Sequence, residues 1–246
     1  MRRIKRYKEL FEAQTELSQE QKEWLDKCTR GKWTLNPQTG LVDVNGSFYC
    51  NNQNLTDFKG VRFGVVTWIF VCSDNELTSL GGAPQEVGVD FNCSYNNLTS
   101  LKDAPQEVGR DFHCYANELT SLKDAPQKVV GSFWCYNNEL TSLEDAPQEV
   151  GRDFSCGNNK LTSLEGAPSW VGGSFYCSDN PVSESVLRSL YKKMKSGMSW
   201  PDAIASQWKN IKSVENKILL ATSNSVFRNK EIKVYQALAR LKIRSI

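Results

Sequence analysis

Hydrophobic residues recur every 21 positions through the middle of the chain. From Leu77 onward each repeat reads Leu-Thr-Ser-Leu, Ala-Pro, Val, Phe and Cys, and an Asn follows three places after the Cys. One coil of this length cannot bury its apolar residues alone, so a fixed period indicates coils stacked on one another. The sequence therefore predicts a repeat solenoid with a continuous core.

Two columns of this repeat form the expected structural ladder. Phe and Cys lie two residues apart, so both side chains point to one face of a short strand, which we expect to be the inner face. The Asn can hydrogen-bond backbone groups of its own and the adjacent coil. The ladder residues are Cys72, Cys93, Cys114, Cys135, Cys156 and Cys177, with Asn75, Asn96, Asn117, Asn138, Asn159 and Asn180.

The first repeats are degenerate. Residues 32–50 predict a hairpin with its turn at 36–40. The step from Cys50 to Cys72 is 22 residues rather than 21, so one residue is inserted there. Gln53 stands where the later repeats have Asn. We expect about seven coils, the first one or two irregular, over residues 32–182.

Both flanks of the repeats predict helices. Residues 7–30 carry a loose apolar stripe that Gly31 closes, which indicates a capping helix within residues 1–31. Residues 183–246 show helical spacing of apolar positions and carry 13 Lys/Arg against 4 Asp/Glu, whereas residues 31–182 carry 9 against 18. The sequence thus predicts an acidic solenoid followed by a basic helical cap or subdomain.

The repeat resembles a known family. The run Leu-x-x-Leu-x-Cys-x-x-Asn-x-Leu resembles leucine-rich repeats of the short, 21-residue bacterial type. The Leu-Thr-Ser-Leu-Glu-Gly-Ala-Pro unit is similar to repeat proteins of large tailed bacteriophages. The resemblance implies an α/β-type repeat solenoid with a short parallel β-sheet on its concave face. Related bacterial effectors sometimes carry a ubiquitin-ligase domain with a catalytic cysteine, but residues 178–246 contain no Cys.

The residue types argue against an enzyme. The single histidine, His113, falls in an outward strand position, and no catalytic triad, carboxylate and metal cluster or Gly-rich phosphate loop stands out. The cysteines are interpreted as reduced thiols in the core, rather than disulfides or zinc ligands, because a straight ladder suits neither geometry. The sequence predicts no metal, no cofactor, no secretory signal and no membrane span.

The columns beside the Cys ladder vary, and they share the exposed face of the sheet. Aromatic residues gather there in the middle coils, and such residues dominate binding hot spots. Aromatic residues are also good strand formers, which is the competing interpretation. The candidate partner-binding residues are Tyr49, Asn92, Tyr95, His113, Tyr115, Trp134, Tyr136 and Tyr176, with Arg110 and Arg152 at the rim beside Asp90, Asp111 and Asp153.

These observations favour a non-catalytic protein-protein interaction module. The phage resemblance implies a cytoplasmic protein that binds, and inhibits, a host bacterial protein such as a defence or regulatory factor. One alternative is a nucleic-acid-associated protein that acts through the basic C-terminal helices. Another is a structural virion or adhesin component.

Overall fold

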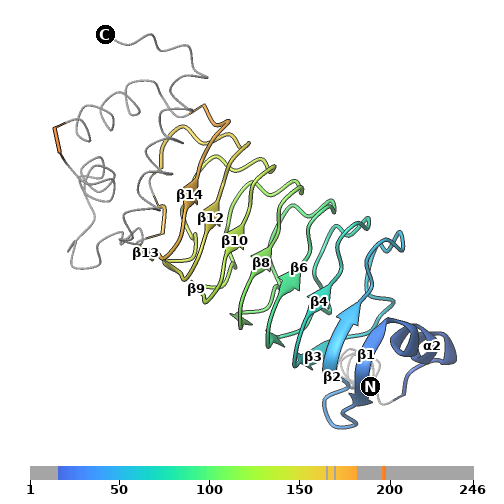
Figure 1. Cartoon of the computed structure of the whole chain (residues 1–246). Helices are drawn as coiled ribbons and strands as arrows, with labels where there is room; N and C mark the ends of the chain where they lie inside the picture. Colours follow the sequence, from blue (N-terminus) through green and yellow to red (C-terminus); the bar gives the residue numbers. More distant parts are fainter. Residues whose placement is uncertain (1–15, 165, 169, 182–195, 198–246) are drawn as a thin grey trace, which may run out of the picture.

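The chain forms a parallel β-solenoid of about six turns, preceded by one helix. The computed structural model describes residues 16–164, 166–168, 170–181 and 196–197. The coils stack along one axis and the stack runs nearly straight across Figure 1. The helices expected within residues 183–246 lie outside the described residues.

Each coil contributes a short strand that contains the Phe of the repeat. Consecutive strands pair in parallel with Phe against Phe, so the sheet runs along the stack (Figure 1). The strands are β2 (Val42–Tyr49), β4 (Phe70–Val71), β6 (Phe91–Asn92), β8 (Phe112–His113), β10 (Phe133–Trp134), β12 (Phe154–Ser155) and β14 (Phe175–Tyr176). The short parallel sheet expected from the sequence is therefore present.

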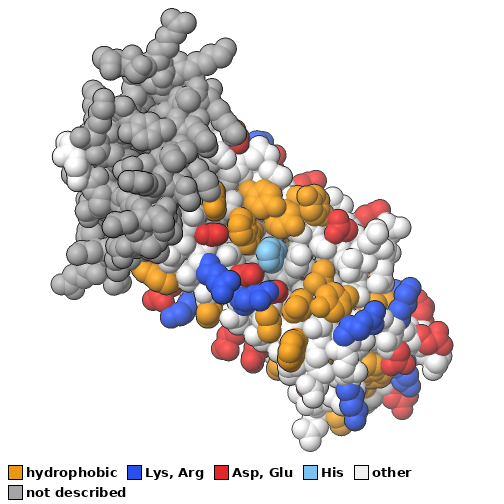
Figure 2. Space-filling view, in the orientation of Figure 1, with side chains coloured by type: hydrophobic (Ala, Val, Ile, Leu, Met, Phe, Trp, Pro, Cys, Tyr) orange, Lys and Arg blue, Asp and Glu red, His pale blue; other side chains and the backbone are white. Residues whose placement is uncertain are grey.

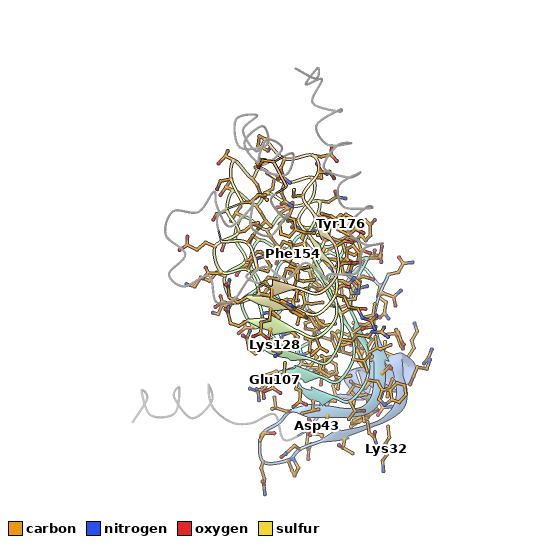
Figure 3. The ribbon with its side chains drawn as sticks, turned by 60° about the vertical axis from the view of Figure 1, so that its left-hand side comes forward. Lys32, Asp43, Glu107, Lys128, Phe154 and Tyr176 are labelled. Atoms are coloured by element: carbon orange, nitrogen blue, oxygen red, sulfur yellow. The ribbon has the colours of Figure 1, made fainter. Side chains whose placement is uncertain are left out.

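A second strand in each coil contains the Val of the repeat. The sequence predicts only one strand per coil, because a two-residue Glu-Val or Lys-Val segment is too short to show an alternating pattern. Three of these strands, β3 (Phe63–Val66), β5 (Glu86–Val87) and β7 (Glu107–Val108), continue the sheet of the Phe strands through β2. The other three, β9 (Lys128–Val129), β11 (Glu149–Val150) and β13 (Trp170–Val171), form a separate three-stranded sheet. In Figure 3 Glu107 and Lys128, which belong to these second strands, lie on the opposite side of the stack from Tyr176.

The first unit is a hairpin rather than a complete coil. β1 (Thr29–Leu35) pairs antiparallel with β2, and β2 then pairs in parallel with both β3 and β4. The structure has about six turns, and this hairpin stands where the first of the expected irregular coils would be. Val42 pairs with Phe63 but Val44 pairs with Val66, so the inserted residue lies in a bulge within β3.

The N-terminal helix is shorter than the sequence predicts. α2 (Gln19–Cys28) begins at a capping box in which Ser18 and Gln21 exchange hydrogen bonds, so residues 16–18 are not helical; residues 7–15 lie outside the described residues. Gly31 is not the helix stop. It lies in β1 at φ 136°, where a side chain would meet the backbone carbonyl of Asn45.

α2 covers the open end of the first coil. The Trp24 ring lies 5.2 Å from the Phe48 ring, between centroids, and 6.3 Å from the Phe63 ring. Its indole Nε1 donates to the side chain of Gln53 at 3.0 Å, and the Gln53 amide donates to the thiol of Cys28 at 3.3 Å. Gln53, which replaces the Asn of later repeats, thus joins the helix to the first turn.

The core is a set of columns that run the length of the stack. Phe rings of neighbouring coils lie 5.2 to 5.8 Å apart between centroids, and those from Phe48 to Phe154 are fully buried. The eight cysteines are free thiols and seven of them are buried. Burial raises the pKa of every thiol, that of Cys177 to about 12. The cysteines therefore act as small core residues.

Each Asn of the ladder binds two coils together. The amide of Asn117 donates to the carbonyl of Cys93 in the preceding coil at 3.1 Å, and to those of Cys114 and Tyr115 in its own coil at 3.2 and 3.3 Å. Its Oδ1 accepts from the backbone N–H of Leu98 at 3.0 Å. The same contacts recur from Asn75 to Asn180. These backbone groups are buried, so solvent water does not satisfy them when the Asn amide is removed.

The Asn ladder yields a stability prediction. Asn117→Ala leaves several buried backbone groups unsatisfied, each of which costs about 1 kcal/mol or more, so we expect the free energy of unfolding to fall by about 3 kcal/mol. Asn180 is half-exposed in the last described turn, so Asn180→Ala should lower the free energy of unfolding by less than half as much. Urea unfolding measures both. Asn97→Ala, at an exposed neighbouring position, is the control, and an equal effect of Asn97 and Asn117 would contradict the ladder's role.

Candidate functional site

The outward face of the Phe-strand sheet carries a continuous aromatic patch. We define the aromatic patch as Tyr95, His113, Tyr115, Trp134, Tyr136 and Tyr176, each of which makes a ring contact with another member. Because the strands pair in register, the same outward position in adjacent coils lies about 4.8 Å away. The solenoid thus brings together rings that are about 20 residues apart in sequence.

One row of the patch follows the residues just before the Cys ladder. The His113 and Trp134 rings are parallel within 5° with centroids 6.4 Å apart. Trp134 also stacks on Tyr176 at 6.4 Å, although β12 lies between their strands. The two rings reach over Ser155, whose small side chain is buried beneath them. Ser155 allows this contact, and nothing in the repeat pattern singles this residue out.

A second row follows the residues just after the Cys ladder. The Tyr115 and Tyr136 rings stack with centroids 4.4 Å apart and planes within 9°. The Tyr95 ring contacts Tyr115 edge-on at 5.3 Å. The rows meet at steep angles, with Trp134 to Tyr136 at 86°. Edge-to-face and offset-stacked contacts of this kind fix the ring orientations before any partner arrives.

Tyr95 occupies a backbone position that disfavours aromatic residues. It has φ 52°, in the left-handed region, and the equivalent positions of other coils hold Asn52, Asp74, Ala116, Asn137, Asn158 and Asp179. Asn and Asp tolerate this conformation, whereas a bulky side chain is strained there. Tyr95 is nevertheless 52% exposed, so core packing does not explain its presence.

The same column provides a second stability prediction. Ala116 also lies in the left-handed region, at φ 53°, where Asn137 stands in the next coil. Ala116→Asn should raise the free energy of unfolding by about 1 kcal/mol, because Asn is less strained there. Denaturant unfolding is the measurement, and the reciprocal Asn137→Ala should lower the same quantity. A neutral or destabilising Ala116→Asn would show that this column carries no strain.

Charged residues border the strand row. Arg110 forms ion pairs with Asp90 and with Asp111, the latter at 3.3 Å, so its positive charge is compensated. The Asp111 carboxylate also accepts from the backbone N–H of Ser132 at 2.7 Å. Arg152 is exposed. Figure 2 shows the pale-blue histidine, the one His of the chain, between orange side chains and a cluster of blue and red ones.

Two members of the patch have shifted pKa values, and both shifts favour the neutral form. Burial lowers the pKa of His113; Asp111 and Asp90 oppose this shift, and Arg110 adds to it. Burial, together with the nearby Tyr115 hydroxyl, raises the pKa of Tyr136 to about 12. The patch therefore presents ring edges, hydroxyl groups and an uncharged imidazole.

The lowered pKa of His113 predicts a pH dependence of stability. Below about pH 6.5 the unfolded chain takes up a proton at this site before the folded chain does, so acid favours unfolding. Wild type should lose more stability between pH 7.5 and pH 5.5 than His113→Gln does. Urea unfolding midpoints of both proteins at the two pH values give the measurement. Identical losses would mean that His113 has the same pKa in both states.

Two predicted residues fall outside the patch, and one exposed ring was not predicted. Tyr49 is separated from His113 by Val71 and Asn92 along the same column. The Asn92 side-chain oxygen accepts hydrogen bonds from the backbone N–H of Ser94 at 3.0 Å and from the Ser94 hydroxyl at 2.6 Å, so this side chain is held locally. Trp68 is 61% exposed in the turn between β3 and β4. It lies in the irregular first repeat, where the column pattern gave no signal.

Within the described residues no three His, Cys, Asp or Glu side chains are placed to hold a metal ion. No helix in that part of the chain is long and apolar enough to cross a membrane. Comparisons with protein-family models, with curated proteins and with solved structures found no match.

Proposed function

We propose that this protein is a non-catalytic protein-binding module and that the aromatic patch is its binding surface. The observation that carries the proposal is Tyr95, an exposed aromatic ring kept in a left-handed turn where most other coils have Asn or Asp and one has Ala116. Backbone strain that packing does not explain is a feature of functional sites. An interface supplies a reason for a ring at this position.

The ring contacts of the patch suit recognition. Tyr and Trp bury a large rigid surface at a small cost in side-chain entropy, which is why they dominate hot spots. Here the stacked rings of Tyr115 and Tyr136, and of His113 and Trp134, are already oriented. Preorganisation of this kind lowers the entropic cost of binding. The contacts of the His113 ring are with Tyr115 and Trp134, which supports a binding role rather than a catalytic one.

The finer assignment rests on the sequence repeat. The short bacterial leucine-rich repeat and its likeness to phage proteins support a cytoplasmic protein that binds a host bacterial protein and inhibits it. In this proposal the basic residues 183–246 form a helical cap on the solenoid. Extended solenoid surfaces are commonly used for recognition, so the architecture agrees with such a role.

Affinity capture from bacterial lysate tests the proposed surface. The full-length protein should retain a specific partner, and the double variant Trp134→Ala/Tyr136→Ala should lose it. Once the partner is identified, we expect its dissociation constant to rise about 30-fold or more in the double variant, the size of a hot-spot effect. Calorimetry with the purified proteins measures this change.

Tyr49→Ala is the matched control, because Tyr49 is an outward aromatic residue of the same sheet outside the patch. It should retain the partner. The proposal is wrong if the double variant stays folded, by circular dichroism and unfolding midpoint, and still captures the same proteins as wild type.

A further inference from the structure

One end of the aromatic patch combines an exposed ring with unpaired carboxylates. Asp74 stands one coil before Tyr95 in the same column, and the two segments are joined by bonds from Asp74 N to Ser94 O and from Asn75 N to Tyr95 O, both 3.1 Å. Neighbouring strands lie about 4.8 Å apart, so the Asp74 side chain starts about one coil spacing from the Tyr95 side chain. Asp74 is exposed and forms no ion pair with any described residue.

Two further acidic residues belong to the coils on either side of Tyr95. Glu76 follows in the same coil as Asp74, and Glu118 follows Tyr115 in the coil after Tyr95. Both are exposed, and neither forms an ion pair within the described part of the chain. Figure 2 shows red side chains along this border of the orange patch. The local charge is negative, in keeping with 18 Asp/Glu against 9 Lys/Arg over residues 31–182.

The positive groups near the patch do not offset this charge at the Tyr95 end, because the exposed Arg152 lies in the coil of β12, three coils further along the stack. Arg110 lies at the border of the other row and is committed to Asp90 and Asp111. The Tyr95 ring contacts Tyr115 at 82°, an edge-on contact that does not pair the two rings face to face. An aromatic ring that is half exposed and flanked by carboxylates attracts cations, because the ring face and the acids both carry negative potential.

We propose that the partner bound by the aromatic patch presents an arginine from an extended basic segment, and that Tyr95 and Asp74 receive this arginine. The inference rests on the protein-binding function proposed above and adds the chemistry of the partner. The planar guanidinium stacks on the Tyr95 ring while its N–H groups donate to the Asp74 carboxylate. The remaining rings bind the apolar and backbone parts of the same segment.

Arginine fits this site better than the alternatives. An acidic segment or a nucleic-acid phosphate would meet Asp74, Glu76 and Glu118 with like charge. A lysine satisfies the carboxylate but has no planar face to stack on the ring. The position of Tyr95 in the left-handed column has the same explanation, since Asn in its place would remove the ring from beside Asp74.

The test uses the full-length protein and a fluorescein-labelled peptide of three arginines separated by glycines, with binding followed by anisotropy at about 150 mM salt. Peptides that replace Arg with Lys, with Glu or with citrulline, the uncharged isostere of arginine, are measured in parallel. We expect the arginine peptide to bind most tightly. Each exposed cation–π contact is worth about two- to fivefold in affinity, so citrulline should reduce binding by about that factor or more.

Two variants locate the site without disturbing the coil. Tyr95→Asn and Asp74→Asn both introduce Asn, the residue that the same left-handed column already holds at Asn52, Asn137 and Asn158. Each should weaken the arginine peptide about three- to tenfold. Asp124→Asn is the charge control: it removes one exposed carboxylate at a left-handed position in a different turn and should leave binding unchanged.

Equal affinity for the arginine and citrulline peptides would overturn the inference, and so would an equal loss of arginine-peptide affinity in Asp74→Asn and Asp124→Asn. The inference is also overturned if the Glu peptide or single-stranded DNA binds more tightly than the arginine peptide. These results are separable from failure of the proposed function, which is tested by partner capture with the Trp134→Ala/Tyr136→Ala variant. If a captured partner fails to bind the Trp134→Ala/Tyr136→Ala variant and still binds Tyr95→Asn normally, that result would support the proposed binding surface and contradict the arginine site at Tyr95 and Asp74.

Discussion

The backbone of each coil can be satisfied only by the coils on either side of it. The Asn column shows the constraint most directly, because Asn117 serves carbonyl groups of its own coil and of the preceding one with a single amide. A coil of different length would move this amide away from its partners. The inner residues therefore repeat strictly, and the outer residues are free to change. The one inserted residue is accommodated as a bulge in β3, close to the N-terminal hairpin, where β2 can pair on both sides.

The same register creates the candidate site. Outward residues of adjacent coils lie at the spacing at which rings stack, so the Tyr115 and Tyr136 rings meet at 4.4 Å without any special loop. Register also brings like charges together. Asp90 and Asp111 follow one another in one column, and Arg110 contacts both, which removes the repulsion between them. A patch of this kind is thus a property of neighbouring repeats, and a single substitution in one coil changes its continuity.

The period made much of this structure predictable from the sequence. It identified the inner columns, the hydrogen-bonding Asn and the outward positions of Tyr115 and Trp134. The second ladder was not predictable, because Glu107–Val108 and its equivalents are two-residue strands defined only by their neighbours. Side-chain direction was also beyond the sequence. Trp134 reaches across Ser155 to Tyr176, and that contact depends on the small size of Ser155 in the strand between the two rings.

The two interpretations of the aromatic residues diverge at Tyr95. Strand-forming propensity accounts for His113, Trp134 and Tyr176, which lie in strands and gain from cross-strand contacts. It does not account for a tyrosine at φ 52° beyond the end of a strand, where most other coils use Asn or Asp and one uses Ala116. The edge-on contact with Tyr115 offsets part of the strain, since such pairs contribute about 1 kcal/mol. It does not require that the ring be half exposed beside Asp74. Among the rings of the patch, Tyr95 is therefore the one whose position is better explained by a ligand than by the fold.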